Sequence, residues 1–592
     1  MATTSQDAAL SQAISETPVL AGNEGRMHYS EREKLFTMIA VLLVMLLASL
    51  DQTIVDTAMP HIISDLQGFS LYTWVTTGYL LTSTVMVPVY GKLSDLFGRK
   101  PIFLIGVVLF LAGSAASGAA QTMLQLVLFR GFQGLGAAAL LPIAMAVIGD
   151  LFTPRERARW QGIAGGVFGL SSVIGPTLGG FITDHTTWRW VFYVNLPVGV
   201  VALLVLIFLM PTLRTARTGK AIIDYLGVMF LVATTVPLLL ALTWGGNAQY
   251  DWNSIQVIGM FIASAVFLVV FVLYERYRER RDLQPIIDPS LFANPVFTSS
   301  VIITMITGAG MFGCIVFLPL FAQGVLGMSA TDSGLRLLPL MAGLIFSSII
   351  SGQLLARTGR YKWLAFIGTL ITIGGSALLL RLDLTSTPVD LIIGMVVLGL
   401  GLGFGMSIYT VIVQNALPDK IGQATAALTF FRSIGGAIAT AVLGAVLNAS
   451  YLPAFQNALP TALKALLPAR LISAFNNPDI LLSSSSQEAL QQQLAQYGTQ
   501  GQVLYQQLLQ AVKVGLTDGI HQVFIVSTII VACAFVAVFF LKEIPMASNR
   551  RDNAPIEALE EAVGESVDYI PITDLPEALS SSDGVLAAEK AR

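Results

Sequence analysis

The chain has 592 residues, of which 54% are hydrophobic and only 12% charged, and its mean hydropathy is +0.73. Soluble proteins contain about 25% charged residues, so this composition excludes a soluble globular domain and indicates a polytopic membrane protein. The net charge of −3 gives no support for nucleic-acid binding, because the basic residues are scattered among short loops.

The apolar segments set the expected membrane topology. Residues 1–34 are polar and do not resemble a signal peptide, so the apolar run that follows is interpreted as an uncleaved first span. A spanning helix needs roughly 20 mainly apolar residues. Fourteen segments meet this requirement, at about residues 35–59, 71–91, 101–120, 123–149, 158–183, 190–211, 223–244, 254–275, 297–322, 333–355, 363–381, 389–414, 422–447 and 519–541.

The distribution of lysine and arginine supports this count. With the N-terminus inside, the inside segments hold 25 of the 33 basic residues and the outside segments hold 5. The remaining three, Arg130, Arg336 and Arg432, lie within or at the edge of spans. Short inside loops are the positively charged ones, so the sequence predicts fourteen spans with both chain ends inside.

The expected organisation is an all-α polytopic membrane protein, with two pseudo-symmetric six-helix bundles and two inserted helices. Its parts are a cytoplasmic N-terminal tail (1–34), the first bundle (35–211), two inserted transmembrane helices with flanking loops (212–296), the second bundle (297–541) and an acidic cytoplasmic tail expected to be disordered (542–592). The external loop 448–518 is expected to form a helical cap or hairpin. It is either a variable surface insertion, or a lid or a surface for an envelope partner.

An internal repeat supports two related halves. GKLSDLFGRK, from Gly91 to Lys100, and GQLLARTGRYK, from Gly352 to Lys362, share a Gly-x6-Gly-Arg frame in corresponding inside loops. Related halves around a central site are the architecture of secondary transporters.

The first predicted span ends in LDQTIVDTAMP, residues 50–60, where Asp51 and Asp56 interrupt an apolar run. An ionised group at mid-bilayer costs at least ~2.5 kcal/mol, so such residues usually face a cavity and carry function. The helical rise places Asp51 at a depth similar to that of Arg130 in the fourth span. We hypothesise that the two are close in one conformational state and that Asp51 exchanges its proton there. Asp56 is a further candidate for proton coupling. The alternative for Asp51 is a structural hydrogen bond, and for Asp56 a hydrated helix end.

Several motifs together resemble the major facilitator superfamily and its fourteen-helix drug:proton antiporter branch. The resemblance rests on GKLSDLFGRK as the signature loop, LDQTIVDTAMP as the first-helix motif, LFRGFQGLGAA around Arg130 as the fourth-helix motif, GLSSVIGPTLGG (169–180) as the fifth-helix antiporter motif, and WRWVFYVNLPVG from Trp188. It covers both halves and the inserted pair, but neither the loop 448–518 nor the tail.

The resemblance implies roles for two further groups of residues. The first group is a gating loop that latches the outward-facing state: Gly91, Asp95, Gly98, Arg99 and Asp150. The second group is the antiporter motif, in which a Gly-Pro break and close backbone contacts would limit leak: Gly169, Gly175, Pro176, Gly179 and Gly180. A basic loop that fixes topology, and helix packing alone, are the respective alternatives.

The second half offers no counterpart to Asp51 or Arg130. Arg432 is the only cation deep in its last three spans, and it could contact substrate, pair with an acid or serve packing. Gly308–Gly313 fits G-x-G-x-x-G, but the motif lies inside a span and is not a nucleotide site. No ATP-binding loop, catalytic constellation or Cys/His metal spacing occurs, so we expect no enzyme, no cofactor and no metal.

These observations predict a proton-coupled antiporter in the cell membrane that exports lipophilic, cationic small molecules by alternating access. Its expected partners are small-molecule substrates, protons and membrane lipids, with no nucleic acid, and we expect a monomer. The alternatives are an exporter of an endogenous lipid or secondary metabolite, a transporter-like sensor and a membrane enzyme.

Overall fold

The computed structural model of the chain describes residues 29–66, 71–212, 223–246, 250–281, 283–328, 335–460 and 499–544, with isolated positions between 472 and 494. Within these ranges the fold is all-α and no strand occurs. Most of the predicted N-terminal tail, the middle of the loop 448–518 and the tail beyond residue 544 lie outside the described residues.

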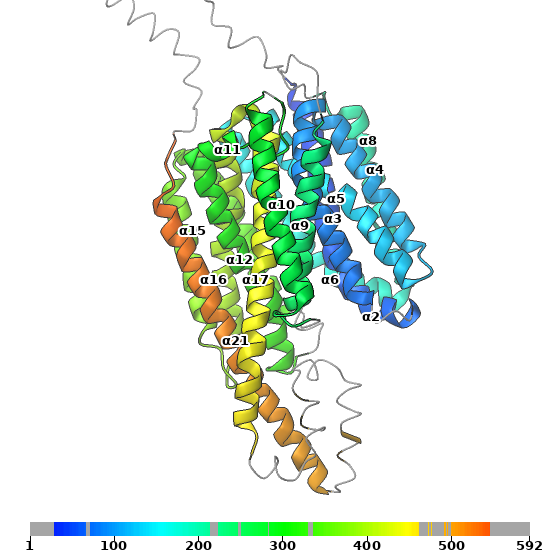
Figure 1. The fold of residues 1–592 in the computed structure, drawn as a ribbon, viewed down its shortest axis with the longest axis vertical. Coiled ribbons are helices and arrows are strands. Elements are labelled where there is room, and N and C mark those ends of the chain that lie inside the picture. Colours follow the sequence, from blue (N-terminus) through cyan, green and yellow to red (C-terminus); the bar gives the residue numbers. More distant parts are fainter. Residues whose placement is uncertain are drawn as a thin grey trace, which may run out of the picture. The chain divides into compact units, whose positions relative to one another are not determined.

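The first half of the chain forms a bundle of long helices (Figure 1). These helices are α2 (Glu31–Leu66), α3 (Tyr72–Phe97), α4 (Arg99–Gly118), α5 (Met123–Leu151), α6 (Pro154–His185), the short α7 (Trp190–Tyr193) and α8 (Asn195–Leu209). Helix α5 packs on α3 and α4, and α2 packs on α6 and α8. The predicted span 190–211 therefore consists of two helices, and Pro197, which has no N–H to donate to the preceding turn, lies just after their junction.

The second half forms a corresponding bundle. It consists of α11 (Ser290–Ala293), α12 (Pro295–Gly324), α14 (Leu338–Thr358), α15 (Lys362–Leu379), α16 (Pro388–Ala416), the 3-10 turn η2 (Pro418–Lys420), α17 (Ile421–Ala458) and α21 (Thr499–Phe539). Helix α16 packs on α14 and α15, and α12, α17 and α21 pack on one another. The two bundles meet where α14 contacts α6 and where α17 contacts α3.

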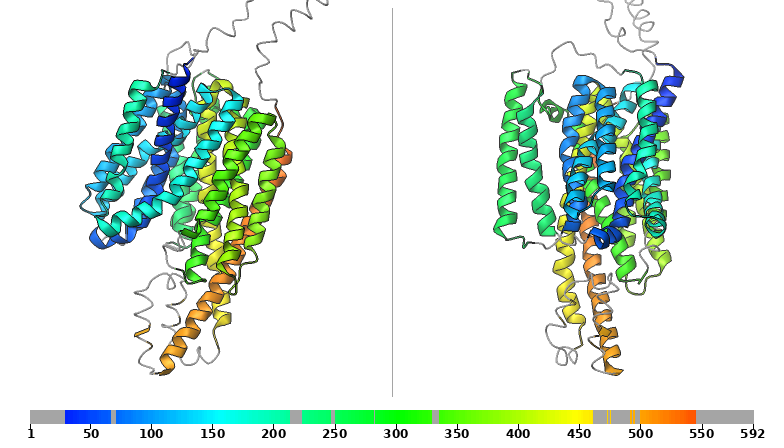
Figure 2. Two further views of the ribbon diagram at one scale, coloured as in Figure 1. Left: turned by 180° about the vertical axis from the view of Figure 1, so that it is seen from behind. Right: turned by 90° about the vertical axis from the view of Figure 1, so that its right-hand side faces the viewer.

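Two helices, α9 (Tyr225–Gly246) and α10 (Ile255–Glu279), connect the bundles and stand beside them as an antiparallel pair (Figure 2). Helix α9 packs on α10 and also against α3 and α17, so it covers the seam between the two bundles. The outward face of α10 is apolar, with Val266 and Leu273 more than half exposed, as expected for a surface in contact with lipid.

The repeated loops each contain a glycine with positive φ at the matched position. Gly98, between α3 and α4, has φ 90°, and Gly359, between α14 and α15, has φ 64°. A positive φ is costly for residues with a side chain, which explains why glycine occupies both matched positions. The match is limited to φ, because ψ is 157° at Gly98 and 1° at Gly359.

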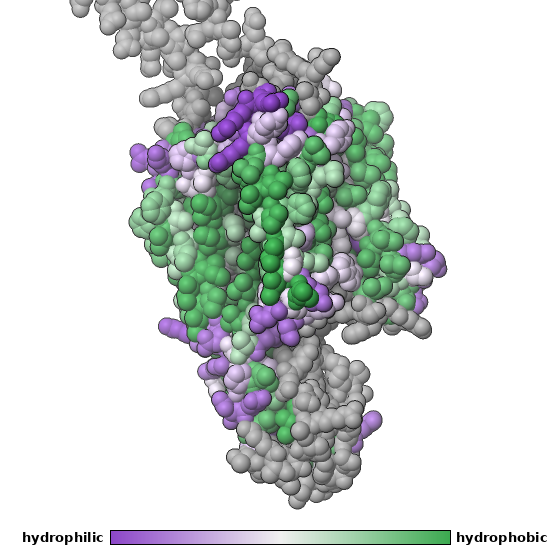
Figure 3. Space-filling model, in the orientation of Figure 1, coloured by the Kyte–Doolittle hydropathy of each residue, from purple (hydrophilic) through white to green (hydrophobic). Residues whose placement is uncertain are grey.

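Thirteen helices in the described part of the chain are long and apolar enough to cross a membrane. The space-filling view agrees, since a broad apolar band separates two polar ends (Figure 3). The fourteenth predicted span corresponds to α3, which packs inside the first bundle but is not among the thirteen. The chain is therefore an all-α polytopic membrane protein, while the count of fourteen and the inside position of both ends stay predictions.

Candidate functional site

The two charged residues predicted to lie at similar depth form an ion pair. Arg130 of α5 donates from Nη1 to Asp51 Oδ2 of α2 over 2.7 Å. Asp51 is 0% exposed and Arg130 is 1% exposed. Each charge is therefore compensated by the other in an environment without water, where an unpaired charge would be strongly unfavourable.

Neutral side chains complete the hydrogen bonding of Asp51. Gln133 Nε2 and Asn195 Nδ2 donate to Asp51 Oδ1 over 2.9 and 2.8 Å. Gln133 Oε1 accepts a second hydrogen bond from Arg130, and Asn195 also donates to Ser114 Oγ over 3.1 Å. The two carboxylate oxygens of Asp51 thus accept hydrogen bonds from three donors. The site thus joins four helices, α2, α4, α5 and α8.

Sequence reasoning missed Gln133 and Asn195. Gln133 follows Arg130 by three residues and so shares its helix face, a signal that could have been used. Asn195 lies 144 positions from Asp51 in the chain, and no local pattern connects the two. Asp56 belongs to α2, but its side chain lies outside the described part of the chain, so its predicted role is neither supported nor weakened.

Aromatic rings cover the guanidinium of Arg130. Its Cζ lies 4.1 Å from the centroid of the Tyr79 ring and 5.8 Å from that of Phe192. Such contacts stabilise a desolvated cation by an amount on the order of 1–2 kcal/mol. Tyr79 also lines the large cavity described below, so this residue contacts both Arg130 and that cavity.

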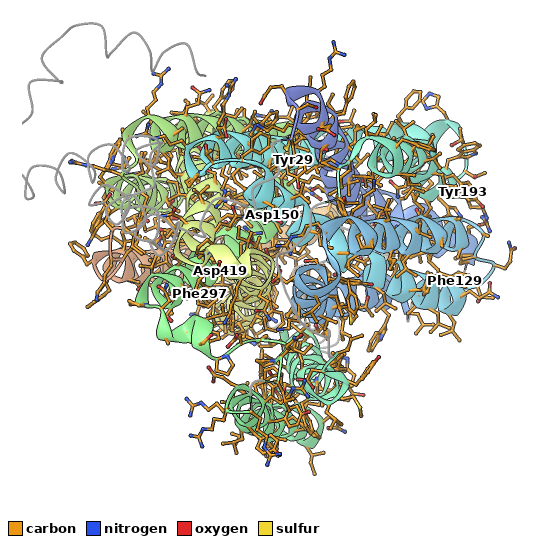
Figure 4. All side chains as sticks on the ribbon, turned by 90° about the horizontal axis from the view of Figure 1, so that it is seen from above. Tyr29, Phe129, Asp150, Tyr193, Phe297 and Asp419 are labelled. Carbon is orange, nitrogen blue, oxygen red and sulfur yellow. The ribbon has the colours of Figure 1, made fainter. Side chains whose placement is uncertain are left out.

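The predicted gating-loop residues form a second buried charge cluster at the other end of the first bundle. Arg99 pairs with Asp95 over 2.5 Å and with Asp150 over 2.6 Å, and it donates to Ser94 Oγ over 2.7 Å. Figure 4, which looks onto this end, shows Asp150 near the middle of the view, with Asp419 of η2 close by.

Asp95 also binds the other half of the protein. Its carboxylate accepts hydrogen bonds from the backbone N–H groups of Gly422 and Gln423, over 3.2 and 2.8 Å. These are the first free N–H groups of α17, where the helix dipole favours an anion. A Cβ on Gly91 would lie 3.0 Å from the carbonyl oxygen of Gly422, so glycine there permits the close approach of α3 and α17. Asp95 and Gly91 thus join α3 to the start of α17, and the latch role of these residues stays a prediction.

A neighbouring ion pair fixes the segment that connects the inserted helices to α12. Lys420 Nζ lies 2.5 Å from Asp288 Oδ2 and donates to Ser290 Oγ over 2.8 Å. Burial raises the pKa of Asp288, but the hydrogen bonds from Lys420 and Ser290 outweigh burial and hold that pKa below its ordinary value. Gln423 also donates to the Ile286 carbonyl oxygen over 3.3 Å, which ties the same segment to the latch.

Sequence reasoning also missed a charge cluster at the base of the inserted pair. Arg278 Nε lies 3.0 Å from Asp224 Oδ2, and Glu275 accepts a hydrogen bond from the Ile286 N–H over 3.0 Å. Asp224 and Glu275 lie at the ends of the predicted spans 223–244 and 254–275, and no local pattern in the sequence connects them. Their burial shows that they anchor α9 and α10 to the segment leading into α12.

The antiporter-motif glycines of α6 differ in their surroundings. A Cβ on Gly175 would lie 2.7 Å from Thr53 Cβ, and one on Gly179 would lie 2.9 Å from the Ile54 carbonyl oxygen. Gly169 faces Ile345 of α14 in the same close manner, whereas Gly180 has open space around it. Three of the four glycines therefore bring α6 against α2 or α14, two of them within a turn of Asp51. Pro176 lies inside α6, where it removes one helical hydrogen bond.

A cavity of about 390 Å³ lies between the bundles. Side chains of α2, α3, α5 and α6 line one part of it and those of α12, α16 and α17 another, while Leu239, Leu242 and Thr243 of α9 contribute as well. The lining is mainly apolar, with hydroxyl and amide groups such as Ser83, Gln52 and Gln161. A cavity of this size and character suits a drug-sized molecule.

Arg432 is the only charged side chain among the described residues that line this cavity. It lies on α17, in the second half, and the structure does not bring it together with Asp51 or Arg130 into one cluster. No Asp or Glu occurs among the described lining residues. The charge that a substrate meets on this wall is therefore positive.

Comparisons with known proteins agree on a family. The sequence pattern of the Major Facilitator Superfamily matches residues 41–440. Multidrug transporter protein MdtP of Bacillus subtilis is 38% identical over 541 residues, covering 88% of this chain and 95% of the relative. Multidrug resistance protein 3 of the same bacterium is 40% identical over 412 residues, covering 69% of this chain and 79% of the relative.

Solved structures show the same fold at low sequence identity. The human organic anion transporter MFSD10 gives a TM-score of 0.55 at 12% identity, covering 86% of this chain and all of the other. The proton:xylose symporter XylE gives a TM-score of 0.54 at 12% identity, covering 87% of this chain and 97% of the other.

Proposed function

The chain belongs to the Major Facilitator Superfamily, and from this membership we propose that it is a proton-coupled antiporter that exports lipophilic small molecules. Proteins of this family are transporters and not enzymes, and the candidate spans make the chain a multi-pass protein of the cell membrane. Multidrug efflux is supported by the two relatives named for it and by the mainly apolar cavity between the bundles.

The Asp51–Arg130 pair beside the cavity is the observation that carries the proton-coupled part of the proposal. A carboxylate that is fully buried, yet paired with an arginine that contacts a cavity-lining residue, can exchange a proton when the bundle rearranges. Protonation removes the charge of Asp51 and leaves Arg130 without its counterion. An unpaired buried charge is destabilising by several kcal/mol, so protonation favours a different arrangement of α2 and α5.

The neighbouring groups suit both protonation states. When Asp51 is ionised it accepts from three donors, and when it is protonated its O–H needs an acceptor. Asn195 Oδ1 is buried and has no hydrogen-bond partner among the described residues, so it can accept that O–H after a small rotation. Arg130 then retains Gln133 and the ring of Tyr79 as partners. Asp51 and Arg130 thus have hydrogen-bond partners in both protonation states of Asp51. A group that carries a proton needs partners in both states.

The closed latch and the cavity complete an alternating-access cycle. The latch joins the two halves at the predicted inside end, so the described conformation corresponds to the outward-facing or occluded part of the cycle. Proton binding at Asp51 loosens the α2–α5 contact, the halves tilt and the Asp95 hydrogen bonds to α17 break. Cargo then enters from the inside while Asp51 releases its proton there.

Accumulation of a lipophilic fluorescent dye into inverted vesicles under an imposed pH gradient tests this proposal. Asp51→Asn should abolish pH-driven accumulation but keep dye–dye exchange without a gradient, because exchange needs substrate binding and rocking but no titration. Asp65→Asn is the control for loss of a paired acid elsewhere on the same helix, since Asp65 pairs with Arg189 and its side chain is 53% exposed. A correctly inserted Asp51→Asn protein that still accumulates dye in response to pH would exclude Asp51 as the coupling group.

A further inference from the structure

Arg432 stands at the junction of two cavities. It lines the large cavity of about 390 Å³, and it also lines a smaller pocket of about 40 Å³ between α12, α15 and α16. Met311 and Met406 line both spaces as well, so the small pocket is a side chamber of the large one, with Arg432 at the boundary.

The guanidinium of Arg432, a half-buried residue, differs from those of Arg99, Arg130 and Arg278 in having no acidic partner among the described residues. Arg99, Arg130 and Arg278 each pair with an aspartate over 2.5 to 3.0 Å. Among the described residues Arg432 forms no ion pair, and neither cavity is lined by Asp or Glu. A charge taken out of bulk water without a counterion is unfavourable, so this position is suited to an anion brought by a ligand.

Packing holds the arginine side chain in this position. A Cβ on Gly308 of α12 would lie 2.9 Å from Arg432 Cγ, so the glycine leaves room for the aliphatic part of the side chain between α12 and α17. Gly308 is the first glycine of the G-x-G-x-x-G segment that was rejected as a nucleotide motif. Its role here is to seat Arg432.

The side chamber supplies a hydrogen-bond donor that is not already used. Thr307, Thr369 and Thr372 each donate to a backbone carbonyl oxygen of their own helix over 2.7 to 2.8 Å. Thr304 also lines the chamber and is 4% exposed, but its hydroxyl has no hydrogen-bond partner among the described residues. Its hydroxyl is therefore available to donate to a group that enters the chamber.

The two volumes match the two ends of an amphipathic molecule. A site needs about 10–15 Å³ of such volume for each water, so the chamber of about 40 Å³ accommodates a group the size of a carboxylate. The large cavity lies within the range of about 300–1,000 Å³ that is typical of drug-sized ligands.

We propose that Arg432 and Thr304 form a binding subsite for the anionic group of lipophilic substrates, such as a carboxylate, while the apolar body occupies the large cavity. Arginine and a hydroxyl are suitable donors for a carboxylate, which arginine can bind through two parallel hydrogen bonds. This inference deepens the proposed efflux function and replaces the cationic cargo expected from the sequence. Exchange of a monoanion for one proton also moves two net charges, so export by this route responds to membrane potential.

Equilibrium binding to the purified full-length protein in lipid nanodiscs, without any gradient, tests the subsite separately from proton coupling. Three fluorescent or radiolabelled probes are compared: 1-pyrenebutyrate, its uncharged methyl ester, and the cation tetraphenylphosphonium. The wild-type protein should bind the carboxylate at least tenfold more tightly than the ester. Arg432→Gln should remove that preference and leave ester binding unchanged, while Arg432→Lys should retain part of it.

Two further variants make the outcome decisive. Arg381→Gln removes an exposed arginine of the same half and should change nothing. Thr304→Val keeps the shape of the side chain and should lower carboxylate binding severalfold with no effect on the ester. If Arg432→Gln misfolds and loses ester binding as well, the result for Thr304→Val tests the subsite by itself. An unchanged carboxylate-to-ester ratio in Arg432→Gln and Thr304→Val, or tighter binding of tetraphenylphosphonium than of the carboxylate by the wild type, would overturn the subsite. Failure of the Asp51 test alone would leave it intact.

Discussion

The Asp95→Asn substitution should open the latch at the start of α17. Asp95 accepts two backbone hydrogen bonds from α17, over 3.2 and 2.8 Å, and pairs with Arg99. An asparagine keeps one oxygen, but it places an amide NH2 group against a backbone donor and carries no charge. Arg99 would keep its pair with Asp150, so the loss falls on the contact between the two halves.

The size of the effect follows from these contacts. A hydrogen bond to a charged group contributes about 1.5–3 kcal/mol. Losing one such bond and the charge on the other amounts to roughly 3 kcal/mol, which shifts the equilibrium between closed and open latch by about a hundredfold. The N–H groups of Gly422 and Gln423 report this shift directly, because they can exchange with solvent only when the latch opens.

Hydrogen–deuterium exchange of the peptide containing Gly422 and Gln423 is the measurement. Asp95→Asn should accelerate exchange there by about a hundredfold, while peptides from α15 keep their wild-type rates. Asp383→Asn, which changes an aspartate in an exposed loop, is the matched control. Unchanged exchange at these two amides would refute the reasoning, because it would show that the Asp95 contact does not protect them. Equal acceleration throughout both bundles would refute it too, because it would indicate general destabilisation.

Two further predictions concern stability. Gly175→Ala should lower the free energy of unfolding by about 1–3 kcal/mol, because its methyl group meets Thr53. Gly180→Ala, in open space on the same helix, should leave the melting temperature unchanged. Equal effects of the two substitutions would argue against the close α2–α6 contact. Asp288→Asn should lower the melting temperature at neutral pH. Because the pKa of Asp288 is depressed in the folded protein, its stabilisation is present above the unfolded-state pKa of about 3.9 and is lost as pH falls through the folded-state pKa. Melting curves of both proteins should therefore converge in strong acid, and a constant difference would contradict this assignment.

The sequence predicted the ends of a helix well where the apolar run and the helix have the same ends. The predicted segments 254–275 and 389–414 correspond to α10 and α16, which end within a few residues of them. The prediction was short where a helix continues beyond the apolar region. Helix α17 extends to Ala458 and α21 begins at Thr499, about 20 residues before the apolar run that marks its span. Hydropathy reports contact with lipid, whereas a helix in water needs only suitable propensity and neighbours.

The candidate site was predictable to the extent that charge in an apolar run is conspicuous. Asp51 and Arg130 could be placed at one depth because helical rise is constant, and the structure brings them together. Gln133 and Asn195 are uncharged and could not be distinguished from ordinary polar residues. The sequence also could not predict the sign of the charge on the cavity wall. That sign depends on the lack of an acidic residue near Arg432, which only the three-dimensional packing determines.

The two bundles meet at the α3–α17 seam and at the α6–α14 seam, and the contacts at these two seams are of different kinds. At the α3–α17 seam the halves are joined by the carboxylate of Asp95, whereas the equivalent position in the repeat is Ala356, which has no charge. At the α6–α14 seam small residues replace charge: a Cβ on Gly162 would lie 2.7 Å from the Ser348 carbonyl oxygen. Separating α3 from α17 therefore requires breaking hydrogen bonds to a charged group, whereas α6 and α14 are joined at Gly162 by close packing without such bonds.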